Sequence, residues 1–205
     1  MNPGRGGQER PGNFMRNIRL SIEYDGTAYR GWQRQPDGPS IQGTLEEVIG
    51  KMTGETVTVI GAGRTDAGVH ALGQVANFRT GTRIPAENLH KGLNSLLPPD
   101  IAVRDLADAD PSFHARYDAR RKIYFYRMIR RPWRPALLRN CAWHLRGPLS
   151  LPRMEEGAPL FIGTLDFTSF CATQCDTRGR TRTVFRSFLT CGGGGEMRDT
   201  SEADG

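Results

Sequence analysis

Residues 61–70 read Gly-Ala-Gly-Arg-Thr-Asp-Ala-Gly-Val-His and connect two segments with the composition of β-strands. Three glycines surround a single carboxylate, that of Asp66. Glycine permits positive φ and close approach of another molecule, so the stretch is typical of a reactive group that meets a bulky substrate. The simpler interpretation is a tight turn in which Asp66 hydrogen-bonds its own backbone. The rest of the sequence has to decide between the two.

The same stretch fails two tests for a phosphate-binding loop. Gly63 and Gly68 have P-loop spacing, but a Val-His pair follows them where Lys and Ser or Thr are required. A dinucleotide-binding loop would have its third glycine where Asp66 stands. We therefore expect no nucleotide cofactor here.

Positive charge is concentrated in one part of the chain. The net charge is +6, and three of the 28 basic residues are lysines. From position 116 to position 146 the only acid is Asp118. The basic residues of this stretch are Arg116, Arg120, Arg121, Lys122, Arg127, Arg130, Arg131, Arg134, Arg139 and Arg146, and its aromatic residues are Tyr117, Tyr124, Phe125, Tyr126, Trp133 and Trp143. Arginine binds phosphate and stacks on bases, so this mixture favours a nucleic-acid partner over a solvated face of mixed charge.

The cysteines and the apolar residues limit other classes. The four cysteines do not suggest a disulfide framework in 205 residues. Cys171 and Cys175 have a spacing that suits a metal, but no second Cys or His pair has zinc-site spacing, so we expect no metal. No apolar run reaches the length of a membrane span and no signal peptide is recognisable, which predicts a cytoplasmic protein.

The first half of the chain predicts an α+β fold. Residues 1–15 are polar and rich in glycine, so we expect a disordered extension. The elements expected after it are a strand over 17–24, a helix capped by Ser40 or Thr44 and ended by Gly54, strands over 56–60 and 74–78, a helix from Pro85, and a strand over 101–106. Their order, β-α-β-β-α-β, predicts a ferredoxin-like N-terminal half over 16–110.

The second half predicts a less complete unit. The expected elements are a strand over 122–129, a helix over 151–161 weakened by Gly157 and Pro159, and a strand over 183–190. After Cys191 come four glycines and a polar tail without apolar periodicity. We therefore predict a second, incomplete ferredoxin-like half over 111–190 and a disordered tail over 191–205.

Several short motifs occur together and in order. They are Tyr24-Asp25-Gly26-Thr27, Gly31-Trp32-Gln33, Gly63-Arg64-Thr65-Asp66-Ala67-Gly68-Val69-His70-Ala71, Gly73-Gln74, Leu93-Asn94, Phe113-His114-Ala115-Arg116 and Lys122-Ile123-Tyr124-Phe125-Tyr126. Over residues 16–190 the chain strongly resembles the bacterial tRNA pseudouridine synthases that modify the anticodon stem-loop at tRNA positions 38, 39 and 40.

This resemblance implies two ferredoxin-like halves in each subunit of a homodimer, a positively charged cleft for tRNA, and no cofactor. It also implies that Asp66 is the catalytic aspartate, that Tyr124 packs against the target uracil, and that Arg64 helps to hold the flipped nucleotide. Further RNA-binding candidates are Arg178, Arg120, Arg121 and Lys122.

The chemistry of the reaction fits these residue types. Uridine becomes pseudouridine when the bond from base nitrogen to sugar breaks and the base rejoins through carbon, with no redox change. The base has to leave the stack, which costs a few kcal/mol and favours an aromatic partner such as Tyr124. A carboxylate at Asp66 either attacks C1′ of the sugar or removes a sugar proton, with Arg64 as the nearest cation in sequence. The simpler interpretations are core packing for Tyr124 and a structural or RNA-contacting role for His70.

The chain departs from the family pattern after residue 190. Family members continue into a segment with a Phe-Leu-x-x-Met-Val-Arg motif, which completes the second sheet and contributes to the dimer. Nothing in residues 191–205 matches it, so the sequence looks truncated, and we expect weak or no activity and a doubtful dimer. The alternative is a non-catalytic RNA-binding module. A hydrolase of a small substrate is disfavoured by the arginine and aromatic residues.

Overall fold

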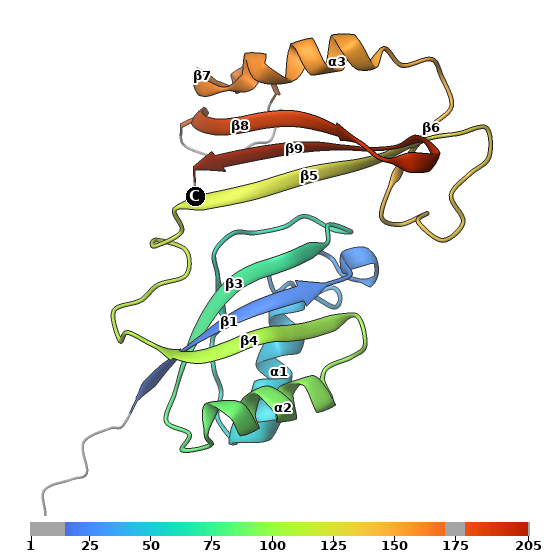
Figure 1. Ribbon diagram of the computed structural model, residues 1–205. Helices are drawn as coiled ribbons and strands as arrows, with labels where there is room; N and C mark the ends of the chain where they lie inside the picture. Colours follow the sequence, from blue (N-terminus) through green and yellow to red (C-terminus); the bar gives the residue numbers. More distant parts are fainter. Residues whose placement is uncertain (1–14, 171–178, 205) are drawn as a thin grey trace, which may run out of the picture. The chain divides into compact units, whose positions relative to one another are not determined.

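The computed structural model describes residues 15–170 and 179–204. The chain divides into two compact units, Met1–Arg116 and Tyr117–Gly205 (Figure 1). The boundary predicted after residue 110 therefore lies slightly too early. The extension predicted over residues 1–15 falls outside the described residues, except for Met15. Within the described ranges, no helix is both long and apolar enough to cross a membrane.

The first unit is a four-stranded sheet with two helices. Its elements are β1 (Arg16–Tyr24), α1 (Ile41–Thr53), β2 (Ile60–Gly61), β3 (Ala71–Thr80), α2 (Ala86–Leu96) and β4 (Ile101–Ala109), with a 3-10 turn, η1, at Gly26–Ala28. The strand order is β2-β3-β1-β4, and every neighbouring pair is antiparallel. Both helices lie on one face of the sheet (Figure 1).

Alternation along β1 builds the core of this unit. Ile18, Leu20, Ile22 and Tyr24 are all at most 3 % exposed, and they pack with apolar residues of both helices. Successive side chains of a strand point to opposite faces of the sheet, so these four residues share the face that the helices cover. The prediction of a half-buried strand is confirmed.

Helix α1 begins and ends as its sequence predicts. The Ser40 hydroxyl accepts a hydrogen bond from the amide of Gly43 at 3.2 Å, so Ser40 is the N-cap. Thr44 lies inside the helix, where its hydroxyl donates to the carbonyl of Ser40 at 3.0 Å. Gly54 ends the helix with a φ of 73°.

The strand predicted over residues 56–60 is shorter than expected, because β2 begins only at Ile60. The amide of Val59 donates to the carboxylate of Glu46 and its carbonyl accepts from the Gln42 side-chain amide, both at 3.0 Å. Side chains of α1 thus form the hydrogen bonds to the Val59 backbone that a neighbouring strand would otherwise form. The β-branched residues Val57 and Val59 are buried here without extending the ladder.

The second unit contains a five-stranded mixed sheet. Its elements are β5 (Arg121–Arg130), β6 (Trp143–Leu145), α3 (Leu151–Gly157), the 3-10 turn η2 (Ala158–Phe161), β7 (Gly163–Asp166), the turn η3 (Thr168–Phe170), β8 (Thr181–Cys191), the turn η4 (Gly193–Gly195) and β9 (Glu196–Asp204). The order is β6-β5-β9-β8-β7, with β5 and β6 parallel and the other pairs antiparallel. The predicted helix over 151–161 changes to 3-10 geometry after Gly157. The α+β class is confirmed.

The disordered tail predicted over residues 191–205 was wrong, because the segment forms η4 and β9. Gly194 and Gly195 adopt φ values of 69° and 79°, which make the reversal after β8 possible. β9 then inserts between β5 and β8 and pairs with both (Figure 1). Its residues are mainly polar, and Glu196 and Glu202 pair with arginines of the neighbouring strands. Charge pairing and backbone hydrogen bonds therefore support β9, which has no apolar periodicity to signal it.

Candidate active site

Asp66 lies in the connection between β2 and β3, as predicted. A turn follows it, in which the Val69 amide donates to the Asp66 carbonyl at 3.2 Å and Gly68 has a φ of 77°. The residue is exposed. Its carboxylate forms no hydrogen bond or ion pair with any side chain of the described residues. The acid is thus free to meet a substrate, and the turn that uses its own carboxylate is not formed.

The loop that carries Asp66 is bonded to the segment after β1. The Trp32 amide donates to the Thr65 carbonyl at 2.9 Å, and the hydroxyls of Tyr24 and Thr65 are 2.8 Å apart. On the other side of Asp66, the Gly68 amide donates to the Tyr29 carbonyl at 3.4 Å. The backbone on both sides of the exposed acid is therefore fixed to one neighbouring segment.

Glycines allow this close contact. Gly31 has a φ of 92°, and a Cβ there would overlap the carbonyl oxygen of Thr65. A Cβ on Gly26 would overlap the carbonyl oxygen of Val69. These two glycines, which belong to the segment after β1, let it pack directly on the backbone of the Asp66 loop.

A second carboxylate holds the end of the loop. The Oδ1 atom of Asp25 lies 3.0 Å from Nδ1 of His70 and accepts from the Thr27 amide at 2.9 Å. Hydrogen bonds from Thr27, together with His70, lower the pKa of Asp25 below its ordinary value. Burial and a 2.7 Å hydrogen bond to Asp100 raise the pKa of Tyr29. Asp25 and His70 hold the end of the loop, whereas the Tyr29 hydroxyl binds Asp100, and none of these groups bonds to the Asp66 carboxylate. The structural role considered for His70 agrees with its contact to Asp25.

Arg64 is exposed and forms no ion pair with Asp66. Sequence proximity alone therefore does not bring the two side chains into contact in the described part of the chain. Arg64 remains available to a ligand, since none of the ion pairs between described residues uses it.

Tyr124 lies on β5 in the second unit, opposite Ser201 of β9. It is 55 % exposed, and Tyr126, two residues along the same face, is 70 % exposed. Burial of part of the ring raises the pKa of Tyr124, and the charge of Arg182 acts in the opposite direction. Core packing, the simpler interpretation of Tyr124, is not supported by this exposure.

The basic candidates have different surroundings. Arg120 is exposed, and Lys122 is half-buried. The Arg121 guanidinium lies 2.7 Å from the carboxylate of Glu202 and 5.1 Å from the centre of the Phe185 ring. Arg178 lies outside the described residues. Among the candidates that the structure describes, Arg121 is the one whose charge is already paired.

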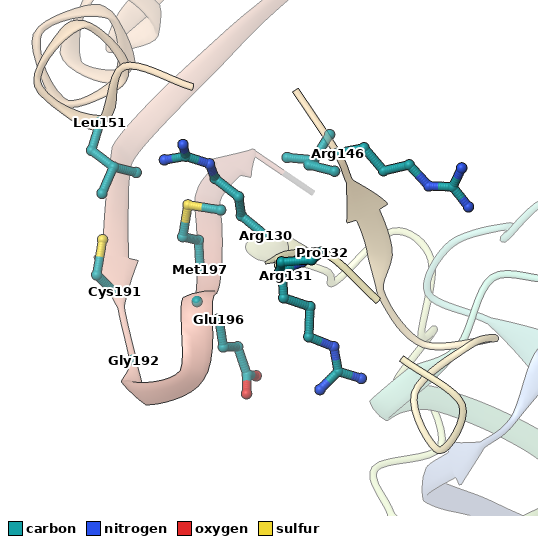
Figure 2. Close-up of a pocket in the computed structure, with 11 residues that line it drawn as sticks. Arg130, Arg131, Pro132, Arg146, Leu151, Cys191, Gly192, Glu196 and Met197 are labelled. Carbon is teal, nitrogen blue, oxygen red and sulfur yellow. The ribbon is translucent and has the colours of Figure 1, made fainter. Parts of the chain in front are cut away.

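A pocket of about 540 Å3 lies within the second unit, beside the turn between β8 and β9 (Figure 2). Three arginines line it, Arg130, Arg131 and Arg146, together with the backbone of Gly192. Figure 2 shows the Arg130 guanidinium on the side of Leu151, while the side chains of Arg131 and Arg146 extend in other directions. The cations do not converge on one point, so the pocket is basic without forming a compact anion site.

No metal centre is visible in residues 15–170 and 179–204, where no three His, Cys, Asp or Glu side chains gather in a suitable cluster. Cys171 and Cys175, the pair with metal-ligand spacing, are outside those ranges. Cys141 and Cys191 are free and exposed.

The residues that hold the Asp66 loop have no role that the sequence alone predicts. Tyr24, Gly31 and Trp32 were noted only as parts of motifs. The sequence does contain a signal for this role, because the motifs at residues 24–27 and 31–33 place glycines and aromatic residues close to the end of a strand. Only the fold shows that these motifs contact residues 65–69.

The first unit thus presents an exposed carboxylate on a firmly held loop, in an α+β chain that is rich in arginine. A family model described as tRNA pseudouridine synthase matches residues 20–118. The tRNA pseudouridine synthase A of Caldicellulosiruptor bescii is 49 % identical over 176 residues, which are 86 % of this chain and 72 % of the relative. The protein of the same name from Geotalea daltonii is 49 % identical over 171 residues, covering 83 % and 70 %. The chain therefore belongs to the tRNA pseudouridine synthase family.

Proposed function

We propose that this chain isomerises uridine to pseudouridine in the anticodon stem-loop of tRNA, at positions 38, 39 and 40, with Asp66 as the catalytic carboxylate. The observation that carries the proposal is the state of Asp66: an exposed acid without a side-chain partner among the described residues, on a loop whose backbone is fixed on both sides. Preorganisation of this kind is what a group that acts on a bound sugar requires.

The carboxylate acts on the ribose of a nucleotide that has left the stack. It either attacks C1′, displacing the base, or removes a sugar proton. Both routes need a carboxylate oxygen that is not already bonded to another protein group. Arg64, two residues before Asp66 and also exposed, suits a contact with the phosphate or sugar of that nucleotide. Its lack of a protein partner among the described residues supports this role.

Tyr124 offers an aromatic ring to the everted uracil. More than half of its surface is exposed, on a strand that also carries Arg121 and Lys122. Stacking on an aromatic ring contributes roughly 1–3 kcal/mol per base and replaces part of the stacking lost when the base leaves the helix. Arg120, Arg121, Lys122 and Arg178 are proposed to contact the RNA backbone.

We also infer that the first unit is ferredoxin-like. Its element order, β-α-β-β-α-β, and its antiparallel strand order, β2-β3-β1-β4, support this assignment. The homodimer implied by the family resemblance and the cytoplasmic location expected from the sequence stay predictions.

The proposal is tested by incubating the full chain with unmodified tRNA and mapping pseudouridine in the product. Asp66→Asn removes the carboxylate and retains its shape, and Asp37→Asn is a matched control at another exposed acid of the same unit. The expected result is weak modification by the parent and the Asp37 variant and none by the Asp66 variant. Binding of tRNA without modification by any of the three would favour an RNA-binding module instead.

A further inference from the structure

Thr65 is bonded through both its backbone and its side chain. Its carbonyl accepts from the Trp32 amide at 2.9 Å, and its hydroxyl lies 2.8 Å from the hydroxyl of Tyr24. The two partners are among the most buried large side chains of the first unit, with Trp32 2 % and Tyr24 3 % exposed. The residue directly before Asp66 is therefore attached to the core.

Tyr24 is a rigid anchor. It is the last residue of β1, and it pairs with Ala71 of β3 on one side and Ile101 of β4 on the other. The centre of its ring lies 6.2 Å from that of the Trp32 ring. A buried phenol needs a hydrogen-bond partner, and the partner that the structure provides is the hydroxyl of Thr65.

The Asp66 side chain has no comparable restraint. It forms no hydrogen bond or ion pair with another side chain of the described residues. The location of its carboxylate consequently depends on the backbone of residues 65 and 66. That backbone depends on the bonds made by Thr65, because residue 65 is the last anchored point before the acid.

We propose that Tyr24 and Thr65 are positioning residues, whose hydroxyl pair holds the Asp66 carboxylate in the position from which it reaches the ribose. The inference rests on the proposed function, and it adds two residues that do not touch the substrate. A displacement of about 1 Å at a catalytic group costs up to roughly 100-fold in rate, so one lost hydroxyl has a large effect on kcat.

Conservative variants separate positioning from folding. Tyr24→Phe retains the ring that packs on Trp32 and removes only the hydroxyl. Thr65→Val retains the side-chain volume, and Thr65→Ser retains the hydroxyl. The matched control is Tyr29→Phe, which loses a partly buried 2.7 Å hydrogen bond to Asp100 in the same region. It leaves in place the Tyr29 carbonyl, which is the group that contacts the loop.

The test measures kcat and KM for tRNA, the melting temperature, and hydrogen exchange of the backbone amides of residues 62–70. Tyr24→Phe and Thr65→Val are expected to lower kcat by about 10- to 100-fold with KM within about twofold of the parent. The double variant should have a kcat no lower than that of the less active single variant, since both substitutions remove the same hydrogen bond. Thr65→Ser should recover most of the rate. Amide exchange in residues 62–70 should be faster in the two impaired variants and unchanged in Tyr29→Phe, although all three lose some stability.

Three results overturn the inference, and they distinguish its failure from that of the proposed function. If the parent chain modifies tRNA and Tyr24→Phe and Thr65→Val retain its kcat, the hydroxyl pair does not position Asp66, and the proposed function stands. A fall in kcat equal to that of Tyr29→Phe has the same meaning, because it reflects stability alone. If the parent chain modifies no tRNA, the proposed function fails, and the inference fails with it.

Discussion

The imidazole Nδ1 of His70 lies 3.0 Å from the carboxylate Oδ1 of Asp25, and this contact joins the end of the Asp66 loop to the first turn after β1. Asp25 also accepts from the amide of Thr27. The pair is only partly buried, with the His70 side chain 29 % and that of Asp25 49 % exposed. Its contribution to stability is therefore modest, about 1 kcal/mol or less.

The hydrogen bonds from Thr27, together with the His70 contact, predict a pH-dependent loss of stability in Asp25→Asn. The pKa of Asp25 is lowered in the folded chain, so its stabilising contribution is complete above the ordinary value of about 4 and disappears as the pH falls through the lowered folded pKa. Asp25→Asn should melt at a lower temperature than the parent at pH 7 and at nearly the same temperature near pH 2. A difference that is equal at both pH values would contradict the assignment. Asp37→Asn serves as the control.

Gly31→Ala should destabilise the first unit more than Gly54→Ala does. Both glycines have positive φ, so both variants are strained by about 1 kcal/mol. A Cβ on Gly31 would also overlap the Thr65 carbonyl, whereas no atom lies within 4 Å of one on Gly54. We expect an additional loss of about 1–3 kcal/mol at Gly31, measured by urea unfolding. Equal losses of unfolding free energy in the two variants would mean that the Asp66 loop moves to make room for the added Cβ at no cost.

Glu202→Gln should strengthen tRNA binding. Glu202 of β9 lies 2.7 Å from Arg121 and 3.9 Å from Arg186, so its charge competes with phosphate for both guanidinium groups. We expect severalfold tighter binding at low salt, and a decline of affinity with salt whose logarithmic slope is steeper by about 0.7–0.9 for each additional phosphate that the variant binds. Glu155→Gln, an exposed acid on α3, is the control. An unchanged slope would place Arg121 outside the RNA-binding surface.

Tyr124→Ala should impair modification more than Tyr126→Ala. Both side chains are exposed on the same face of β5, so the two variants lose similar surface and similar stability. If Tyr124 alone stacks on the uracil, its removal costs roughly 1–3 kcal/mol, or about 5- to 150-fold in kcat/KM. Equal effects of the two variants would assign both tyrosines to general RNA binding.

Local patterns were sufficient to predict most of the first unit. The alternation of β1 and the Ser40 and Gly54 caps of α1 correspond to hydrogen bonds and burial found in the structure. β2 is shorter than its β-branched sequence predicts, because the backbone of the buried Val59 bonds to side chains of α1. Hydrophobic periodicity indicates burial and does not identify the hydrogen-bond partner of the backbone.

The second unit was less predictable for a different reason. β9 has mainly polar residues and lies between two arginine-bearing strands, so its support comes from Glu196 and Glu202 and from backbone pairing with distant segments. The sequence motifs were sufficient to name Asp66 and Tyr124 as candidate site residues. The contacts of Tyr24 and Gly31 with the loop depend on the packing of two connections far apart in sequence, which spacing alone does not reveal.

The most direct test of the central claim is pseudouridine mapping after incubation of unmodified tRNA with the parent chain, Asp66→Asn and Asp37→Asn. We predict pseudouridine in the anticodon arm with the parent and with Asp37→Asn, and none with Asp66→Asn despite unchanged tRNA affinity. Modification by Asp66→Asn at the rate of the parent would contradict the assignment of this carboxylate to catalysis.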